Sequence, residues 1–117
     1  YLSRGLGDVY KRQAQWTTQK ILSIRELADH TADYVREQLP KIYSRELIDV
    51  IFEQPYCRIS NVVAAGIAKR QTASEYLKKL VTIDVLVEQP TGRERLFLQP
   101  KLIQLLTQEH NQFNRYS

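Results

Sequence analysis

Residues 60–97 read SNVVAAGIAKRQTASEYLKKLVTIDVLVEQPTGRERLF, and this stretch decides the fold. Ser60 has a side chain suited to the N-cap of a short helix over residues 61–65. Gly66 follows that helix. Glycine is common at this position because it adopts the left-handed conformation without steric strain. Ile67 is apolar and can anchor the turn in the core. The pattern predicts a short helix that ends in a tight turn.

A second helix is predicted directly after this turn. Thr72 and Glu75 have the spacing of a capping box, in which each side chain bonds the backbone amide of the other residue. Apolar and aromatic side chains then recur at helical spacing on one face: Ala73, Tyr76, Leu77, Leu80 and Val81. The opposite face is polar and carries Lys78 and Lys79. A face of this kind is as typical of a solvated surface helix as of a helix that binds a partner.

A β-hairpin is predicted after the second helix. Residues 85–89 and 95–98 have the composition of short strands, and Pro90 and Gly92 favour a turn between them. Asp84 precedes the first strand and tolerates the left-handed conformation better than most residues. Helix, turn, helix and hairpin in this order define a winged helix-turn-helix. We therefore predict a mainly α (α+β) fold: a winged helix-turn-helix preceded by a long helix.

Basic and polar side chains gather where this fold contacts DNA, at the start of the second helix and near the hairpin tip. Arg and Lys can bind phosphates or guanine, and Gln can bind adenine. The predicted DNA-binding residues are Lys69, Arg70, Gln71, Thr72, Ser74, Lys78, Lys79, Arg93 and Arg95. Residues 58–101 hold eight Lys or Arg against four acidic residues, whereas residues 14–57 hold five against seven. This modest basic excess favours weak or regulated binding over constitutive tight binding.

The whole chain is expected to contain one small core. Its predicted segments are residues 1–13 as a non-native, disordered segment, 14–40 as a long connecting helix, 41–108 as the winged helix-turn-helix domain and 109–117 as a frayed tail. The run RGLGDVYKRQ at residues 4–13 resembles a translated sequencing adapter, so a native chain would begin near Ala14. Pro40 is expected to end the long helix, and Ser44 to cap the next one.

Several runs of this sequence resemble the C-terminal region of bacterial Fic-family (Fic/DOC) proteins. They are YSREL at 43–47, FEQPYCRI at 52–59, GIAKRQTAS at 66–74 and YLKKL at 76–80. The resemblance covers about residues 14–108, and its most specific part is the run that begins at Gly66. It implies that the full-length parent is a protein adenylyltransferase, which transfers AMP from ATP to a hydroxyl group of a target protein. It also implies that the catalytic core lies upstream of this region.

The catalytic signature of that family is His and Phe, then an acidic residue, Gly-Asn-Gly and Arg. The chain has two histidines, His30 and His110, and neither is followed by this pattern. The single cysteine, Cys57, excludes an internal disulfide and favours a reducing cytoplasm. One cysteine and two distant histidines do not form a metal site. We therefore predict no catalytic residue, no metal, no cofactor and no membrane contact for this chain.

Two classes of function remain open from the sequence. The first is a DNA-binding or regulatory module that uses the basic side chains named above. The second is a protein-interaction module that forms a homodimer or positions an upstream Fic catalytic domain. The placement of the basic residues favours DNA, while Glu75 and Glu94 lie in the proposed contact face and weaken the case.

Overall fold

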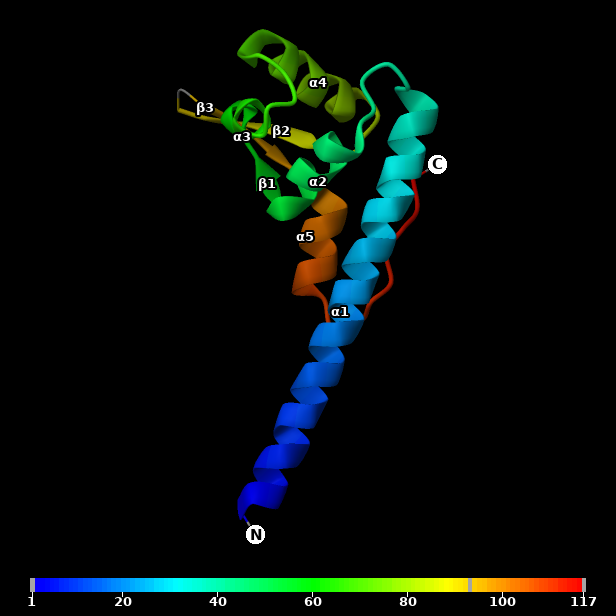
Figure 1. Cartoon of the computed structure of the whole chain (residues 1–117), viewed down its shortest axis with the longest axis vertical. Helices are drawn as coiled ribbons and strands as arrows, with labels where there is room; N and C mark the ends of the chain where they lie inside the picture. The colour runs from blue at the N-terminus through cyan, green and yellow to red at the C-terminus, as the bar shows by residue number, and fades with distance from the viewer. Residues whose placement is uncertain (1, 93, 117) are drawn as a thin grey trace.

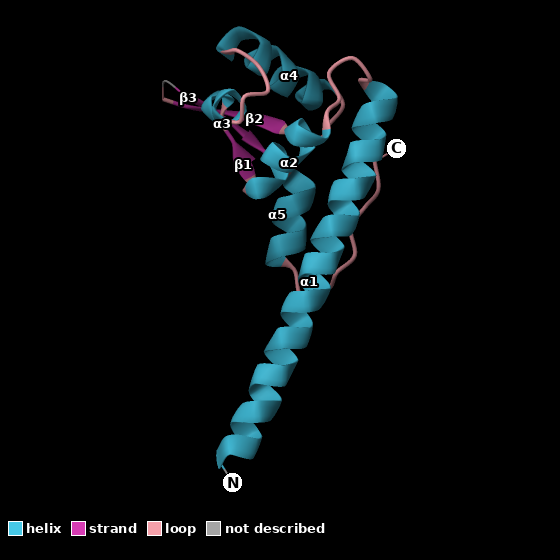
Figure 2. Ribbon diagram, in the orientation of Figure 1, coloured by secondary structure: helices cyan, strands magenta, loops and turns pink. Residues whose placement is uncertain are grey.

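The computed structural model describes residues 2–92 and 94–116, with side chains from residue 12 onward except at 91 and 94. The helices and strands are α1 (Leu2–Gln38), α2 (Arg45–Glu53), β1 (Tyr56–Cys57), α3 (Ile59–Ala64), α4 (Arg70–Thr82), β2 (Val87–Thr91), β3 (Glu94–Leu98) and α5 (Pro100–Thr107). A long helix is followed by a small domain of short helices around a sheet (Figure 1, Figure 2). The predicted α+β winged helix-turn-helix with a preceding long helix is confirmed.

The predicted hairpin is present, and it belongs to a larger sheet than expected. β2 and β3 pair antiparallel from Val87 opposite Leu98 toward the turn, where Gly92 has a φ of +59°. β1 pairs with the other edge of β3, so the strand order is β1-β3-β2. Two residues are too few to show an alternating pattern, which is why the sequence does not reveal β1. Val85, predicted as the first strand residue, instead lies buried just before β2.

The helix-turn-helix forms around the predicted glycine, but both helices begin earlier than predicted. Gly66 has a φ of +77°, and its N–H donates to the carbonyl of Val63 at 3.0 Å. Ser60 is not the N-cap of α3, because that helix begins at Ile59. Its first turn is closed instead by the N–H of Arg58, which donates to Oδ1 of Asn61 at 2.8 Å.

The capping box predicted at Thr72 is also wrong. α4 begins at Arg70 with Lys69 in the N-cap position, so Thr72 is already inside the helix. The N–H of Ala73 donates to the carbonyl of Lys69 at 2.8 Å, which closes the first helical turn before a cap at Thr72 could act. By contrast the cap at Ser44 is confirmed, since its hydroxyl accepts from the N–H of Leu47 at 3.1 Å.

One apolar core joins the sheet to the helices that cover it. Most of its largest fully buried side chains come from α2, α4 and β3, with Phe97 at the centre of the sheet's inner face. Asp84 has a φ of +66° and turns the chain from α4 toward β2, in the left-handed conformation that Asp tolerates. The core thereby holds α4 against the sheet with its polar face outward.

The long helix α1 packs against α2 and α5 through its C-terminal half and extends past the domain toward its N-terminal end (Figure 1). Residues 1–13 were expected to be disordered, yet α1 begins at Leu2. In the part of the chain that the structure describes, no helix is long and apolar enough to cross a membrane.

The C-terminal tail was expected to fray, and the structure differs. Its backbone is irregular, but it runs back along α1 (Figure 1). The N–H of Tyr116 donates to Nε2 of His30 at 2.9 Å, and the Tyr116 ring stacks on Tyr34 with centroids 4.8 Å apart. Aromatic side chains therefore attach a polar segment that composition alone predicts to be loose.

Candidate nucleic-acid interface

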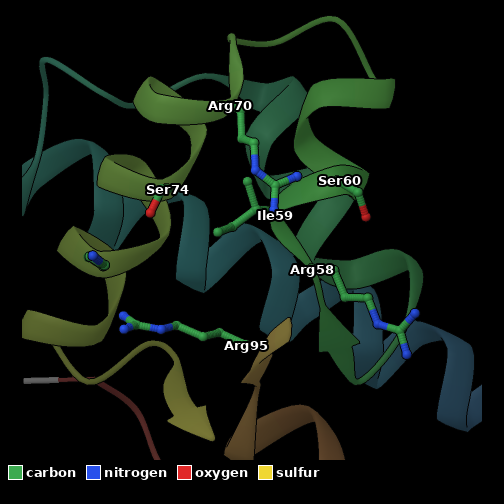
Figure 3. Close-up of a pocket in the computed structure, with 7 residues that line it drawn as sticks. Arg58, Ile59, Ser60, Arg70, Ser74 and Arg95 are labelled. Carbon is green, nitrogen blue, oxygen red and sulfur yellow. The ribbon is translucent and has the colours of Figure 1, made fainter. Parts of the chain in front are cut away.

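A basic cleft lies between the start of α3, the exposed face of α4 and β3. It has a volume of about 240 Å³. Seven residues line it: Arg58, Ile59, Ser60, Arg70, Ser74, Lys78 and Arg95. Figure 3 shows Arg70 extending from α4 over Ile59, and Arg95 extending from β3 toward α4. The lining therefore contains four cationic side chains, two hydroxyl groups and one apolar side chain, from three separate elements.

The helical period of α4 explains its side of the cleft. Arg70, Ser74 and Lys78 are four residues apart, so they form one stripe along the helix. Ala73, Leu77 and Leu80 are fully buried on the opposite side and fix the rotation of the helix. The predicted apolar face of this helix is thus confirmed at these three positions.

The opposite wall depends on the sheet. β1 pairs with β3 through Cys57 and Phe97, which brings the start of α3 beside the β3 strand that carries Arg95. Arg95 also donates to Oε1 of Glu88 on β2 at 2.8 Å, and the two residues belong to adjacent strands. This ion pair orients the Arg95 guanidinium and partly offsets its charge.

A second groove continues from the cleft across α4. Its lining adds Gln71 and Glu75 to residues shared with the cleft. Among the described residues, Arg70 and Lys78 form no ion pair, and both are exposed. Their positive charge is thus available to a ligand at the boundary between the two hollows.

The predicted DNA-binding residues are only partly brought together. Four of them line the cleft: Arg70, Ser74, Lys78 and Arg95. Lys69 and Lys79 are exposed but outside its lining, while Thr72 is half-buried within α4. Gln71 lines only the second groove. Arg93 lies outside the described residues.

Arg58 and Ser60 also line this surface, and neither was predicted as a DNA-binding residue. Both precede α4 by ten residues or more and carry no DNA-binding motif of their own. The signal that could have found them is the pairing of β1 with the hairpin, and β1 is too short to recognise from its pattern.

Two other kinds of site, a reactive thiol and a metal centre, have little support among the described residues. Cys57 is buried, and burial, reinforced by the nearby carboxylate of Glu53, raises the pKa of its thiol to about 11. Such a thiol is almost wholly protonated near neutral pH and is a poor nucleophile. Within residues 2–92 and 94–116, no group of three or more His, Cys, Asp or Glu side chains is placed to hold a metal ion.

The fold and the cleft together define a winged helix-turn-helix domain with a basic concave surface beside its second helix. A family model described as "Protein adenylyltransferase SoFic-like, C-terminal domain" matches residues 27–102. The match begins in the second half of α1 and reaches the start of α5, so it includes the helix-turn-helix, the sheet and the whole cleft. The chain belongs to this family of Fic-type C-terminal domains.

Proposed function

We propose that this domain binds DNA as a regulatory module of a Fic-family protein. The observation that carries the proposal is that one concave surface beside α4 is lined by Arg58, which precedes α3, by Arg70 and Lys78 of α4, and by Arg95 of β3. Cations scattered for solubility have no reason to share a hollow, whereas a DNA backbone passing α4 would meet all of them.

The arrangement assigns different roles to the two hollows. Cations in the cleft are suited to phosphate oxygens, because Arg and Lys only donate hydrogen bonds. Gln71 in the adjoining groove can donate to and accept from a base edge, as the pairing of Gln with adenine requires. Glu75 in the same groove repels phosphate and can accept from cytosine. The domain is thus expected to place bases over the groove and backbone over the cleft.

Fluorescence anisotropy with pooled labelled duplexes tests this proposal. Affinity should fall between about 50 and about 200 mM salt, with a log–log slope of about −0.9 for each phosphate contacted. Changing Lys78 and Lys79 together to Ala should weaken binding to all sequences, because it removes two positive charges that can contact phosphates. Circular dichroism should show an unchanged fold, because both side chains are exposed.

The matched control removes the same charge elsewhere. Arg25 and Lys41 are exposed and lie outside the helix-turn-helix. Their double change to Ala should leave the affinity nearly unchanged. If the parent chain shows no anisotropy change at low salt, the DNA-binding proposal is wrong.

A second candidate is a protein-interaction module that dimerises or positions a Fic catalytic domain. The observation in its favour is that α1 presents Trp16, Ile21 and Leu22 to solvent, at about half of their possible exposure. Large apolar side chains on an extended helix are typical of a surface that meets a partner. This candidate predicts concentration-dependent self-association on a sizing column together with negligible DNA affinity.

We also infer that AMP transfer belongs to the parent protein and not to this chain. The matched family is named for a protein adenylyltransferase, but the match is to its C-terminal domain. Neither histidine of the chain lies in the catalytic signature of Fic proteins. The domain would then serve the enzyme by bringing it to DNA or to a partner.

A further inference from the structure

We propose that α1 and α5 together form a docking surface for a peptide segment that carries Phe and Tyr three residues apart. In this structure the chain's own C-terminal tail occupies that surface in cis, through Phe113 and Tyr116. A partner protein would bind by supplying the same two rings in place of the tail. The inference does not depend on DNA binding, because the residues that hold the tail do not line the basic cleft.

The two aromatic side chains anchor the tail. Phe113 and Tyr116 are half-buried, whereas residues 114 and 115 between them are exposed. Phe113 packs against the small apolar cluster that Leu27 of α1 forms with two leucines of α5. Tyr116 packs against the main apolar core instead. Each ring therefore has its own contact site, and the distance between the two sites fixes the spacing that a docked segment must have.

The contact site for Tyr116 is the more selective of the two. Its ring stacks on Tyr34 and His30, with centroids 4.8 and 5.5 Å away. Nζ of Lys101 lies 4.7 Å from the centroid of the same ring, within reach of a cation–π interaction. The hydroxyl is buried, and burial raises the pKa of Tyr116 to about 12. An aliphatic side chain cannot stack in this way, and a phosphorylated tyrosine would bring charge to a buried oxygen.

Other contacts hold the backbone of the tail and do not depend on its side chains. Nζ of Lys20 donates to the carbonyl oxygens of Gln108 and His110, each at 3.0 Å. The N–H of Tyr116 donates to Nε2 of His30 at 2.9 Å. This part of the tail belongs to no helix or strand, so these contacts fix its course. Backbone hydrogen bonds combined with sites for particular side chains are the usual basis of peptide recognition.

The surface and its occupant differ in their relation to the family match. The matched residues, 27–102, include His30, Tyr34 and Lys101, whereas the tail lies beyond them. The surface thus belongs to the matched domain, and the tail is a separate segment that fills it. A segment tethered in cis competes at an effective concentration of about millimolar, so a partner has to displace it.

Binding of a synthetic tail peptide in trans tests the proposal. The full chain with Phe113→Ala and Tyr116→Ala lacks both anchors, which leaves the surface open. A labelled peptide of residues 109–116, with the wild-type sequence, should bind this variant saturably in fluorescence anisotropy. The parent chain should bind the same peptide at least about tenfold more weakly, because its own tail competes.

An NMR titration locates the bound peptide. The Tyr34 hydroxyl donates to the carbonyl of Ile83 at 3.3 Å, and Asp84 lines one cavity with both tyrosines. The ¹H–¹⁵N signals of residues 30, 34 and 84 should therefore move as peptide is added to the ¹⁵N-labelled variant. Saturable binding that leaves all three signals in place would overturn the assignment of this surface.

Three control peptides test the predicted selectivity. The first is a scrambled peptide of the same composition, and the second has a glycine inserted between Asn114 and Arg115. Both should bind at least about tenfold more weakly, because only one ring can reach its contact site. The third peptide has a phosphorylated tyrosine and should lose binding to a similar extent. Equal binding of all the peptides would show that charge and composition are sufficient, and would overturn the proposal.

The fold of the variant is checked by circular dichroism. If the double variant is unfolded, the single variant Tyr116→Ala, which keeps Phe113, takes its place. Absence of saturable peptide binding to a folded variant overturns the docking surface. No DNA is present in these measurements, so their outcome is independent of the DNA-binding proposal.

Discussion

Gly66 illustrates how a single residue controls the helix-turn-helix. Its φ of +77° is in the left-handed region, and a Cβ built there would meet no heavy atom within 4 Å. The need for glycine is therefore a property of the backbone and not of crowding, since side chains disfavour this conformation. The same region is occupied by Asp84, at a φ of +66°, where a short polar side chain tolerates it.

Changing Gly66 to Ala should lower the free energy of unfolding by about 1 kcal/mol, because alanine resists the left-handed conformation. Gly66→Asn should lose clearly less, since asparagine adopts this conformation more readily. Urea denaturation followed by circular dichroism measures both changes. Equal losses for the two variants would contradict the backbone explanation.

At the scale of elements, Lys20 joins three segments of the chain. Its side chain is buried, and Nζ donates to the carbonyl oxygens of Leu105, Gln108 and His110 at 2.9 to 3.0 Å. These carbonyls lie in and beyond the last turn of α5, where helix carbonyls lack partners of their own and a positive charge is favourable. One ammonium group thereby attaches both α5 and the tail to α1.

Lys20→Met should remove these hydrogen bonds while keeping most of the apolar stem. The expected loss is about 2 kcal/mol in the free energy of unfolding, because hydrogen bonds to charged groups are the stronger ones. Lys41→Met is the control, since Lys41 is exposed, and it should change stability by less than about 0.5 kcal/mol. A loss no larger than that of the control would show that the Lys20 contacts are dispensable.

The contact between the tail and α1 should depend on pH. Nε2 of His30 accepts the N–H of Tyr116, which a protonated imidazole cannot do. Burial, followed by the charges of Arg115 and Lys101, lowers the pKa of His30 below 6.5, against the opposing carboxylate of Asp33. As pH falls, the His30 imidazole is therefore protonated at a higher pH in the unfolded chain than in the folded chain. The stabilising contribution is complete above about pH 6.5 and is lost as pH falls through the lowered pKa.

The ¹H–¹⁵N signal of the Tyr116 amide should accordingly move toward a solvent-exposed position between about pH 7 and about pH 5. In His30→Gln the side-chain carbonyl can accept at any pH, so the signal should respond far less. A Tyr116 signal that is constant in the parent chain over this range would rule out the proposed titration.

The whole molecule combines a small domain with an extended helix, and its longest dimension of 60 Å is about twice the next one. The domain places its basic cleft on the helix-turn-helix, while the helix presents exposed apolar side chains away from it. Both histidines form hydrogen bonds within the chain: Nε2 of His30 accepts from the N–H of Tyr116, and Nδ1 of His110 accepts from the N–H of Gln112 at 3.3 Å.

The purified chain is expected to transfer no AMP from ATP and magnesium to itself or to added protein. Incubation with radiolabelled ATP, followed by gel electrophoresis, measures the transfer. A Fic-family protein that contains the complete catalytic signature serves as the positive control. Labelling above background by this chain would refute the assignment of catalysis to the parent protein.

Local signals in the sequence determined the elements near them. Gly66, Ser44 and the hairpin turn act on neighbours within a few residues, so their effects follow from sequence spacing. The starts of α3 and α4 were predicted two and three residues too late, because several polar residues compete as caps.

Only the tertiary structure decided which distant residues meet. The pairing of β1 with β3 brings Arg58 and Ser60 beside α4, and the contacts of Lys20 and His30 attach a tail that composition predicted to fray. These contacts join residues up to 90 positions apart. Their formation depends on how the buried faces of all the elements pack together, which no short stretch of sequence specifies.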